Sequence, residues 1–212
     1  IYNYKKIFKE INNKFIWRGT SDTEVLLNAW SLWKENTLDK IDGMYSFAIW
    51  DTELETLFLA RDRIGEKPLY FLKKNNSLIF SSRPNPIIEI FTDLKNKFEN
   101  QSLSFYLSAG YFPRNKSFFQ GIQKLEPGSY LKFNKNEFHT KKYWNINDYN
   151  PILKKNNSLN YYVDEFDNLL KESIVDRLSS DKPLGFFLSG GLDSSLIVAI
   201  ASNILKKENI KV

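Results

Sequence analysis

The sequence predicts an α+β domain followed by the beginning of an α/β domain. Between residues 43 and 82, two consecutive pairs of short apolar runs are each joined by a polar turn, a pattern typical of β-hairpins in an antiparallel sheet. After residue 159 the pattern changes to a helix, a continuous apolar run, a glycine-rich turn and a second helix. This second order of elements is how an α/β domain with a buried parallel sheet begins.

The earliest element that the pattern supports is a helix over about residues 22–35. The segment "SDTE" has the Ser-x-x-Glu form of a capping box, which places Ser21 just before the first turn. Apolar side chains then recur at helical spacing. They are Leu26, Ala29, Trp30 and Trp33.

Two hairpins follow this helix. "GMYSFAIWD" and "LFLARD" flank the turn "DTELET", and "PLYFL" and "LIFSS" flank the turn "KKNNS". A short helix is expected over residues 103–107, and Pro127-Gly128 marks a turn before another strand.

The C-terminal part begins after an Asn-rich, Pro-containing stretch that we interpret as a linker, "NINDYNPILKKNNSLN". An amphipathic helix is expected next, "LGFFL" is the expected buried strand, and "SSLIVAIASNILKK" the second helix. The apolar stripe of the amphipathic helix is Val163, Phe166, Leu170, Ile174 and Leu178.

Composition narrows the classes of function. The net charge is +5, but the lysines are scattered among asparagines, which argues against a nucleic-acid partner. No apolar run approaches the ~20 residues of a membrane-spanning helix, so no membrane partner is expected. The chain has no cysteine, which excludes disulfides and thiolate metal sites and fits a cytoplasmic location. The single histidine, His139, excludes a His-cluster metal site.

The segment "PLGFFLSGGLDSSLIVAI" carries the strongest chemical signal. A strand that turns through glycines into a helix offers free backbone N–H groups to an anion, above all phosphate. Asp193 beside such an anion suggests an intervening Mg²⁺. Gly191-Leu192 stands where a Walker A loop needs Lys-Ser/Thr, and Phe187 stands where a nucleophile elbow needs Gly. The remaining structural alternative is a plain glycine turn.

The heptapeptide "SGGLDSS" resembles the pyrophosphate-binding loop of N-type ATP pyrophosphatases. "DRLSSDKPLGFFLSGGLDSSLIVAI" resembles the synthetase domain of glutamine-hydrolysing asparagine synthetases in particular. Six further segments resemble, in order, the class II glutamine amidotransferase domain of the same enzymes. They are "SDTEVLL", "IDGMYSFAIWD", "LFLARDRIGEKPLYF", "YLSAGYFP", "GIQKLEPGSYL" and "KKYW".

This resemblance implies a fold and domain limits. Residues 1–146 would be part of a class II amidotransferase domain, an Ntn-hydrolase-type αββα sandwich. Residues 147–159 would be the linker, and residues 160–212 the N-terminal part of a Rossmann-like ATP pyrophosphatase domain. The chain is therefore expected to be an internal fragment, with a lone strand and helix that leave an uncovered apolar edge.

The resemblance also implies an activity. An ATP-dependent carbon–nitrogen ligase would convert aspartate, glutamine and ATP into asparagine, glutamate, AMP and pyrophosphate, with Mg²⁺, and a homodimer of the full-length enzyme is consistent with it. Asp22 would bind the α-amino group of glutamine, although a helix N-terminal charge explains Asp22 without a ligand. Asp193 would be the Mg²⁺ ligand. The ATP and pyrophosphate contacts would be Leu188, Ser189, Gly190, Gly191, Asp193, Ser194 and Ser195.

Three features limit what the resemblance implies. The family's nucleophile is an N-terminal cysteine, which these residues lack, so we expect the chain by itself to be inactive. Arg61-Asp62-Arg63 and Lys67 are interpreted as mainly structural, with a contribution at the domain interface left open. Ser82-Arg83-Pro84 replaces the family's Ser-Glu-x-Lys, which leaves two alternatives open. They are an amidotransferase of this architecture that acts on a sugar or another acceptor, in surface-polysaccharide biosynthesis for instance, and a non-catalytic remnant.

Overall fold

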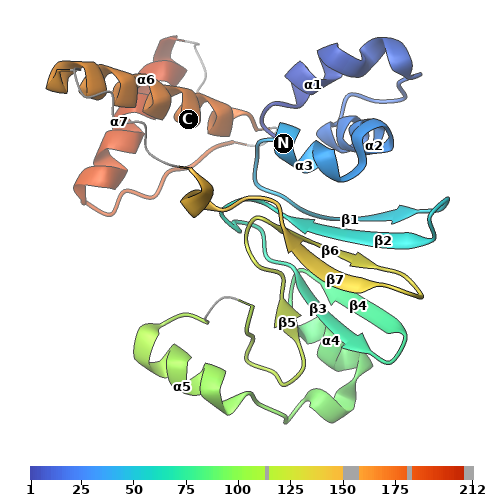
Figure 1. Cartoon of the computed structure of the whole chain (residues 1–212). Helices are drawn as coiled ribbons and strands as arrows, with labels where there is room; N and C mark the ends of the chain where they lie inside the picture. Colours follow the sequence, from blue (N-terminus) through green and yellow to red (C-terminus); the bar gives the residue numbers. More distant parts are fainter. Residues whose placement is uncertain (113–114, 150–157, 181–182, 208–212) are drawn as a thin grey trace.

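The computed structural model describes residues 1–112, 115–149, 158–180 and 183–207, so most of the expected linker lies outside the described residues. Two antiparallel sheets with flanking helices form the first part of the chain, and a pair of helices forms the second (Figure 1). The helices are α1 (Tyr4–Ile11), α2 (Asp22–Trp33), α3 (Thr37–Lys40), α4 (Asn85–Ile90), α5 (Asn100–Ala109), α6 (Leu159–Leu178) and α7 (Leu192–Lys207). The strands are β1 (Ser46–Asp51), β2 (Thr56–Arg61), β3 (Tyr70–Lys74), β4 (Ser77–Ser81), β5 (Gln123–Lys124), β6 (Ser129–Phe133) and β7 (Phe138–Lys142).

Both expected hairpins form, but they belong to different sheets. The first sheet has the order β1-β2-β6-β7 and the second has the order β4-β3-β5. The hairpin pattern alone suggested one antiparallel sheet, whereas the resemblance implied a two-sheet sandwich. The sandwich is correct, because β2 pairs on its free side with β6, where Leu59 lies opposite Leu131, and not with the second hairpin.

Apolar side chains of both sheets meet in one cluster between them. Leu59 of β2 and Leu131 of β6 are fully buried there beside Phe71 of β3. The opposite face of the first sheet packs on α1, α2 and α3, where the Trp30 ring lies 5.2 Å from that of Phe58. The second sheet packs on α4 through Ile87, so the layers are helices, sheet, sheet and helix. This is the αββα arrangement that the resemblance implied.

Helix α2 begins as the sequence predicts and ends slightly earlier. The Ser21 Oγ accepts the backbone N–H of Glu24 at 3.3 Å, as an N-cap should. In a full capping box the Glu24 carboxylate would accept the backbone N–H of Ser21. Here it accepts the N–H groups of Arg18 and Gly19 instead, each at 2.8 Å. The helix ends at Trp33 rather than Glu35, since Lys34 takes a positive φ of 48° and its N–H bonds the Trp30 carbonyl.

Four helices differ from the expectations. Helices α1, α3 and α4 were not predicted, although Tyr4, Ile7 and Ile11 of α1 recur at helical spacing and the last two are buried. Helix α5 covers Asn100–Ala109, longer than the expected residues 103–107, and ends where Gly110 takes the left-handed conformation with φ 77°.

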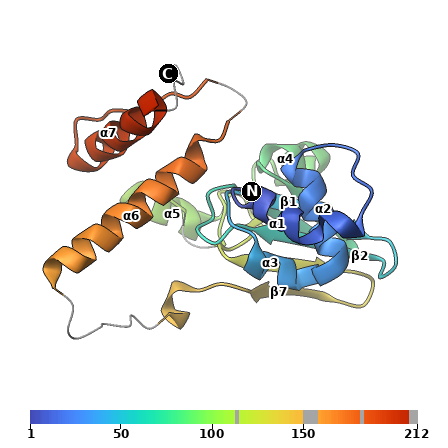
Figure 2. The ribbon, with the colours of Figure 1, turned by 90° about the horizontal axis from the view of Figure 1, so that it is seen from above.

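The C-terminal part confirms the two helices but not the strand between them. Helices α6 and α7 lie side by side, apart from the sheets (Figure 2). Residues 184–188 form no ladder with any described residue, and Phe187 is fully exposed. An extended segment becomes a strand only when a neighbouring strand accepts its hydrogen bonds. Of the predicted stripe on α6, Ile174 is buried, whereas Val163 and Phe166 are exposed.

Candidate functional site

The loop at residues 188–195 turns into helix α7 and presents free backbone donors. Gly190 has φ 81°, a conformation that favours glycine, and nothing lies within 4 Å of the position that a Cβ would take. Helix α7 begins at Leu192, so the N–H groups of its first turn have no intrahelical acceptor. An anion placed there would meet these donors and the positive end of the helix dipole.

Hydroxyl groups surround the same turn. The Ser189 and Ser194 Oγ atoms are 2.9 Å apart, and the Ser195 Oγ donates to the Gly191 carbonyl at 2.8 Å. All of these side chains except the half-buried Ser194 are exposed, and Leu188 beside them is 62% exposed. The loop therefore has the donors and the open space that a phosphate group or pyrophosphate requires.

Asp193 stands in the first turn of α7 and is exposed. Among the described residues, no group of three or more potential ligand side chains could hold a metal ion. Mg²⁺ usually binds proteins through one or two carboxylates and completes its shell with substrate phosphates and water. A single carboxylate beside the loop is compatible with this mode of binding, in which Asp193 would be the protein ligand of Mg²⁺.

Asp22 lies in the first turn of α2, on a different part of the molecule from the loop (Figure 1). Its carboxylate accepts a charge-assisted hydrogen bond of 2.7 Å from the α-ammonium group of Ile1. The position is also favourable for any carboxylate, because it lies at a helix N-terminus.

The segment after β2 holds two buried charges that organise the backbone. The Arg61 guanidinium donates to the carbonyls of Lys67, Leu125 and Gly65, and its burial lowers its pKa. The Asp62 carboxylate, 1% exposed, accepts the backbone N–H groups of Gly65, Glu66 and Lys67 at 2.6 to 3.0 Å. These bonds confirm the structural interpretation of Arg61 and Asp62.

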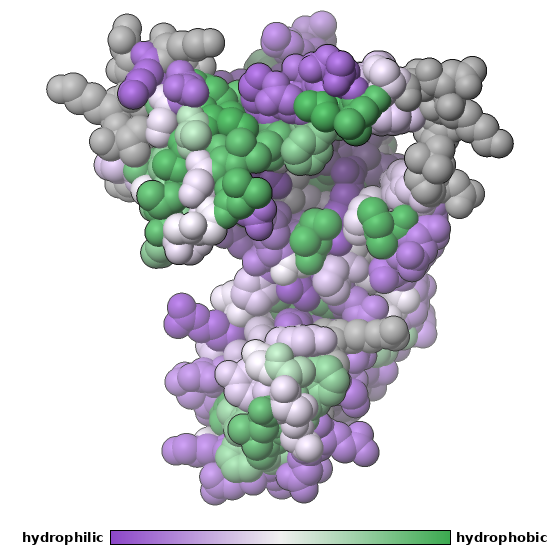
Figure 3. All heavy atoms as spheres, turned by 90° about the vertical axis from the view of Figure 1, so that its left-hand side faces the viewer, coloured by the Kyte–Doolittle hydropathy of each residue, from purple (hydrophilic) through white to green (hydrophobic). Residues whose placement is uncertain are grey.

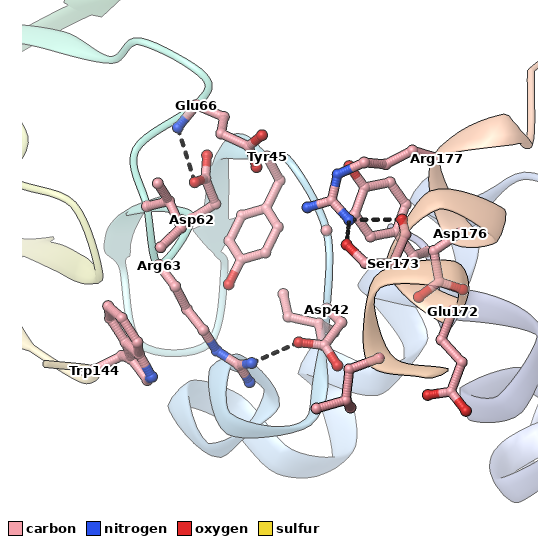
Figure 4. Close-up of a pocket in the computed structure, with 15 residues that line it drawn as sticks. Asp42, Tyr45, Asp62, Arg63, Glu66, Trp144, Glu172, Ser173, Asp176 and Arg177 are labelled. Carbon is pink, nitrogen blue, oxygen red and sulfur yellow. Dashed lines mark hydrogen bonds and ion pairs between the residues drawn. The ribbon is translucent and has the colours of Figure 1, made fainter. Parts of the chain in front are cut away.

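Arg63, by contrast, lines a cavity of about 400 Å³ between the first part of the chain and α6 (Figure 4). Its guanidinium pairs with Asp42 at 2.5 Å. On the other wall, Arg177 of α6 lies over the ring of Tyr2 at 5.0 Å. The expected contribution at an interface therefore falls on Arg63, at the contact between the two parts of the chain.

Sequence analysis did not find this cavity. Tyr45, one of its lining residues, shares a hydrogen bond of 2.8 Å between hydroxyls with Tyr143. Burial raises the pKa of Tyr45 and raises that of Tyr143 to about 12. No local pattern could reveal the cavity, because its lining comes from segments more than a hundred residues apart.

The departure at Ser82-Arg83-Pro84 has a local structural account. Pro84 stands at the N-cap position of α4, where its missing N–H is not required. Arg83 is exposed and is not among the residues that line the cavity beside α6. The proline is thus compatible with the fold, and Arg83 does not face α6 there.

Comparisons with known families match the two parts of the chain separately. The glutamine amidotransferase domain family matches residues 1–144, and the asparagine synthase family matches residues 165–212. No described helix has both the length and the apolar character needed to cross a membrane.

Three curated relatives illustrate the similarity. Asparagine synthetase [glutamine-hydrolyzing] 3 of Bacillus subtilis (strain 168) is 35% identical over 98% of this chain and 33% of its own length. Putative asparagine synthetase [glutamine-hydrolyzing] 2 of Methanocaldococcus jannaschii is 34% identical over 94% of this chain and 38% of its own length. Amidase chry2 of Gibberella zeae is 26% identical over 98% of this chain and 30% of its own length. The chain thus spans about a third of the length of these relatives.

Two solved structures are also similar. The allosteric regulatory enzyme of purine biosynthesis aligns with a TM-score of 0.46 and 20% identity, over 69% of this chain and 28% of its own. Glutamine phosphoribosylpyrophosphate amidotransferase from B. subtilis, complexed with ADP and GMP, aligns with a TM-score of 0.46 and 15% identity, over 96% of this chain and 42% of its own.

Proposed function

This chain belongs to the glutamine amidotransferase domain family, and from that premise we propose that it serves a glutamine-hydrolysing asparagine synthetase. One observation carries the proposal: an amidotransferase match and an asparagine synthase match follow each other on one chain, and the second contains the open loop at residues 188–195. The named synthetases that resemble the chain do so over both parts.

The proposed reaction uses two sites. Hydrolysis of the glutamine amide supplies ammonia, and ATP activates the side-chain carboxylate of aspartate as an adenylate with release of pyrophosphate. Ammonia then displaces AMP to form asparagine. Activation is needed because a carboxylate oxygen is a poor leaving group, and stabilising charge on the departing pyrophosphate lowers the barrier.

The pyrophosphate contacts are proposed to be the free amides and hydroxyls of the loop at 188–195. Gly190 lets the backbone approach the anion, while Ser189, Ser194 and Ser195 add hydroxyl donors. Mg²⁺, held by Asp193, would supply positive charge beside the phosphate oxygens. Leu188 would contact the nucleotide at the loop's open side.

Asp22 is proposed to bind the α-ammonium group of glutamine. The support is the resemblance of "SDTEVLL" to the family and the position of Asp22 in the first turn of α2, where its carboxylate is partly exposed. We propose domain limits of 1–146 and 160–212 with a linker at 147–159, a cytoplasmic location and a homodimer, on the resemblance alone. The amidotransferase nucleophile is proposed to be a cysteine that these 212 residues do not contain, so the isolated chain should release no ammonia from glutamine.

Pyrophosphate binding to the chain tests the loop directly. Gly190→Ala should weaken the affinity about tenfold, because an L side chain at φ 81° costs about 1–2 kcal/mol. Gly185→Ala is the matched control, since its Cβ would also meet open space but its φ is not in the left-handed region. Isothermal titration calorimetry with Mg²⁺ and pyrophosphate measures both, and equal affinities for the two variants would contradict the loop assignment.

The activity itself is tested on the protein expressed from the whole reading frame that contains these residues. Glutamine, ATP and aspartate should give asparagine, and Asp193→Ala should abolish AMP formation while glutamate formation continues. Unchanged synthesis by Asp193→Ala would remove Asp193 from the metal site.

A second candidate is an amidotransferase of the same architecture with another acceptor, such as a sugar. The departure at Arg83 and Pro84 favours it, and one relative of similar coverage is named an amidase rather than a synthetase. The same assay decides between them: ATP-dependent glutamine consumption with a sugar and none with aspartate would support the second candidate. A protein that consumes no glutamine with any acceptor would instead be the non-catalytic remnant.

A further inference from the structure

A second cavity, of about 230 Å³, lies where the edge strands of the two sheets come together. Strand β7 is the edge of the first sheet and β5 is the edge of the second (Figure 1). The floor of the cavity includes Phe71 and Leu125, which also belong to the apolar cluster between the sheets. The cavity is therefore the open end of the intersheet core.

Polar and basic side chains replace apolar ones at this end. Ser129 of β6 lies opposite Lys142 of β7, so these neighbours share a face of the sheet, and Thr140 lies two residues before Lys142 on that face. Lys124 of β5 lies opposite Tyr70 of β3 in the other sheet. The side chains that carry the argument are Lys124, Lys142, Glu126, Ser129 and Thr140.

The charges in this lining are unbalanced. Two lysines, Lys124 and Lys142, lie with one carboxylate, that of Glu126, and none of the three forms an ion pair with another described residue. Lys124 is half-buried. Burial and the nearby Arg61 guanidinium both lower the pKa of the Lys124 ammonium.

An unpaired, half-buried ammonium group is unfavourable, because it loses hydration without gaining a counter-charge. Arg61 adds to the imbalance, since it donates to the carbonyl of Leu125, the residue next to Lys124. Its neighbour Asp62 already accepts three backbone N–H groups. The fold thus gathers positive charge at a small cavity where Glu126 is the one carboxylate among the described lining residues and forms no ion pair.

We propose that this cavity binds a small tetrahedral oxyanion, with inorganic phosphate as the simplest member of the class. Lys124 and Lys142 would supply the charge, and the hydroxyls of Ser129 and Thr140 the neutral donors. The Ser129 hydroxyl is available for this role, because its bond to the Pro127 carbonyl is long, at 3.4 Å. The site is separate from the loop at 188–195 and does not depend on the proposed function.

Titration of the whole 212-residue chain with inorganic phosphate, followed by ¹H–¹⁵N NMR, locates the binding. Backbone amides of residues 123–126 and 140–142 should shift, in addition to any shifts at 189–195. Sodium chloride at matched ionic strength should not reproduce the shifts at the cavity. Shifts confined to 189–195, or shifts that chloride reproduces, would overturn the proposal.

Lys124→Met tests the cavity's charge, and Lys6→Met on α1, an exposed lysine, is the matched control. Lys124→Met should weaken phosphate binding at the cavity at least about tenfold, as expected for loss of a charge-assisted hydrogen bond, whereas Lys6→Met should not change it. In phosphate-free buffer Lys124→Met should melt at a higher temperature than the parent chain, and phosphate should raise the parent's melting temperature by more than the variant's. Unchanged binding by Lys124→Met and by Lys142→Gln would overturn the proposal even if both variants fold.

Discussion

Residues 1–144 bury their apolar side chains in three clusters, whereas α6 and α7 together bury only Ile174, Ala201 and Leu205 among their described residues. Figure 3 shows apolar side chains gathered on the face that includes α6 and α7. The exposed apolar side chains of these two helices include Val163, Phe166, Leu169, Leu192, Leu196 and Ile197.

The comparison shows that periodicity and burial are different properties. Both regions have apolar residues at helical spacing, and both form the predicted helices. In the first region, helix α2 packs on a sheet, and this contact buries Ala29 and Trp30. Helix α6 has an apolar stripe of the same kind, but described residues cover little of it. Helical spacing of apolar residues therefore predicts which face of a helix can be buried, and not whether another element buries it.

The largest expected difference between the regions comes from one substitution made in both. Phe58→Ala should destabilise the chain by about 3–5 kcal/mol, because Phe58 is 1% exposed in the core. Phe166→Ala on α6, where the ring is 62% exposed, should change stability by less than about 0.5 kcal/mol. Urea unfolding followed by tryptophan fluorescence measures the first region, and comparable losses for the two variants would show that α6 belongs to the same core.

A buried carboxylate sharpens the same comparison. Asp62→Ala should cost about 3 kcal/mol or more, because it leaves three backbone N–H groups without their acceptor. Asp176→Ala, an exposed carboxylate of α6, should be nearly neutral. Denaturant midpoints of the two variants give the difference, and a neutral Asp62→Ala would mean that water replaces the carboxylate in the loop.

The pH dependence of stability separates a buried ion pair from an exposed one. Asp51, 8% exposed, is bonded to Lys34 at 2.8 Å. That bond and the N–H groups of Leu54 and Glu53 lower its pKa below the ordinary 3.8. A carboxyl group with a lowered folded pKa adds stability above pH 3.8, and this stability is lost as the pH falls through the folded value.

Asp51→Asn should therefore remove about 1 kcal/mol at pH 7, a value kept small because Lys34 is partly exposed. It should also flatten the loss of stability between pH 4 and pH 2. Asp167→Asn, which removes the exposed pair of Asp167 with Lys171 on α6, should change stability at pH 7 by less than about 0.5 kcal/mol. Thermal melts from pH 2 to pH 7 test both, and parallel profiles for parent and Asp51→Asn would contradict the assignment.

Two serine N-caps give the smallest expected effect. Ser21 caps α2 and Ser158 caps α6, each by accepting a backbone N–H at 3.3 Å. Ser21→Ala should lower the global free energy of unfolding by about 1 kcal/mol, because α2 is packed into the core. Ser158→Ala should only increase amide exchange in the first turn of α6. A global loss of equal size from Ser158→Ala would indicate that the two regions unfold together.

Several features were readable from the sequence because they depend on neighbours along the chain. The cap at Ser21, the two hairpins, the turn at Gly128 and the change of pattern after residue 159 all need only local side-chain and backbone preferences. The glycine turn before α7 belongs to this group, since Gly190, Gly191 and the start of α7 lie within a few residues of each other, whereas anion binding by this turn stays a prediction.

Tertiary structure decided the rest, because those features depend on contacts between residues far apart in the sequence. The pairing of β2 with β6 assigned the hairpins to two sheets, and the ion pair between Lys34 and Asp51 joins the end of α2 to β1. Residues 184–188, although apolar enough for a strand, formed no ladder with any described residue. Local preference can make a segment ready for a helix or strand, but burial and backbone pairing require a partner surface that only the fold supplies.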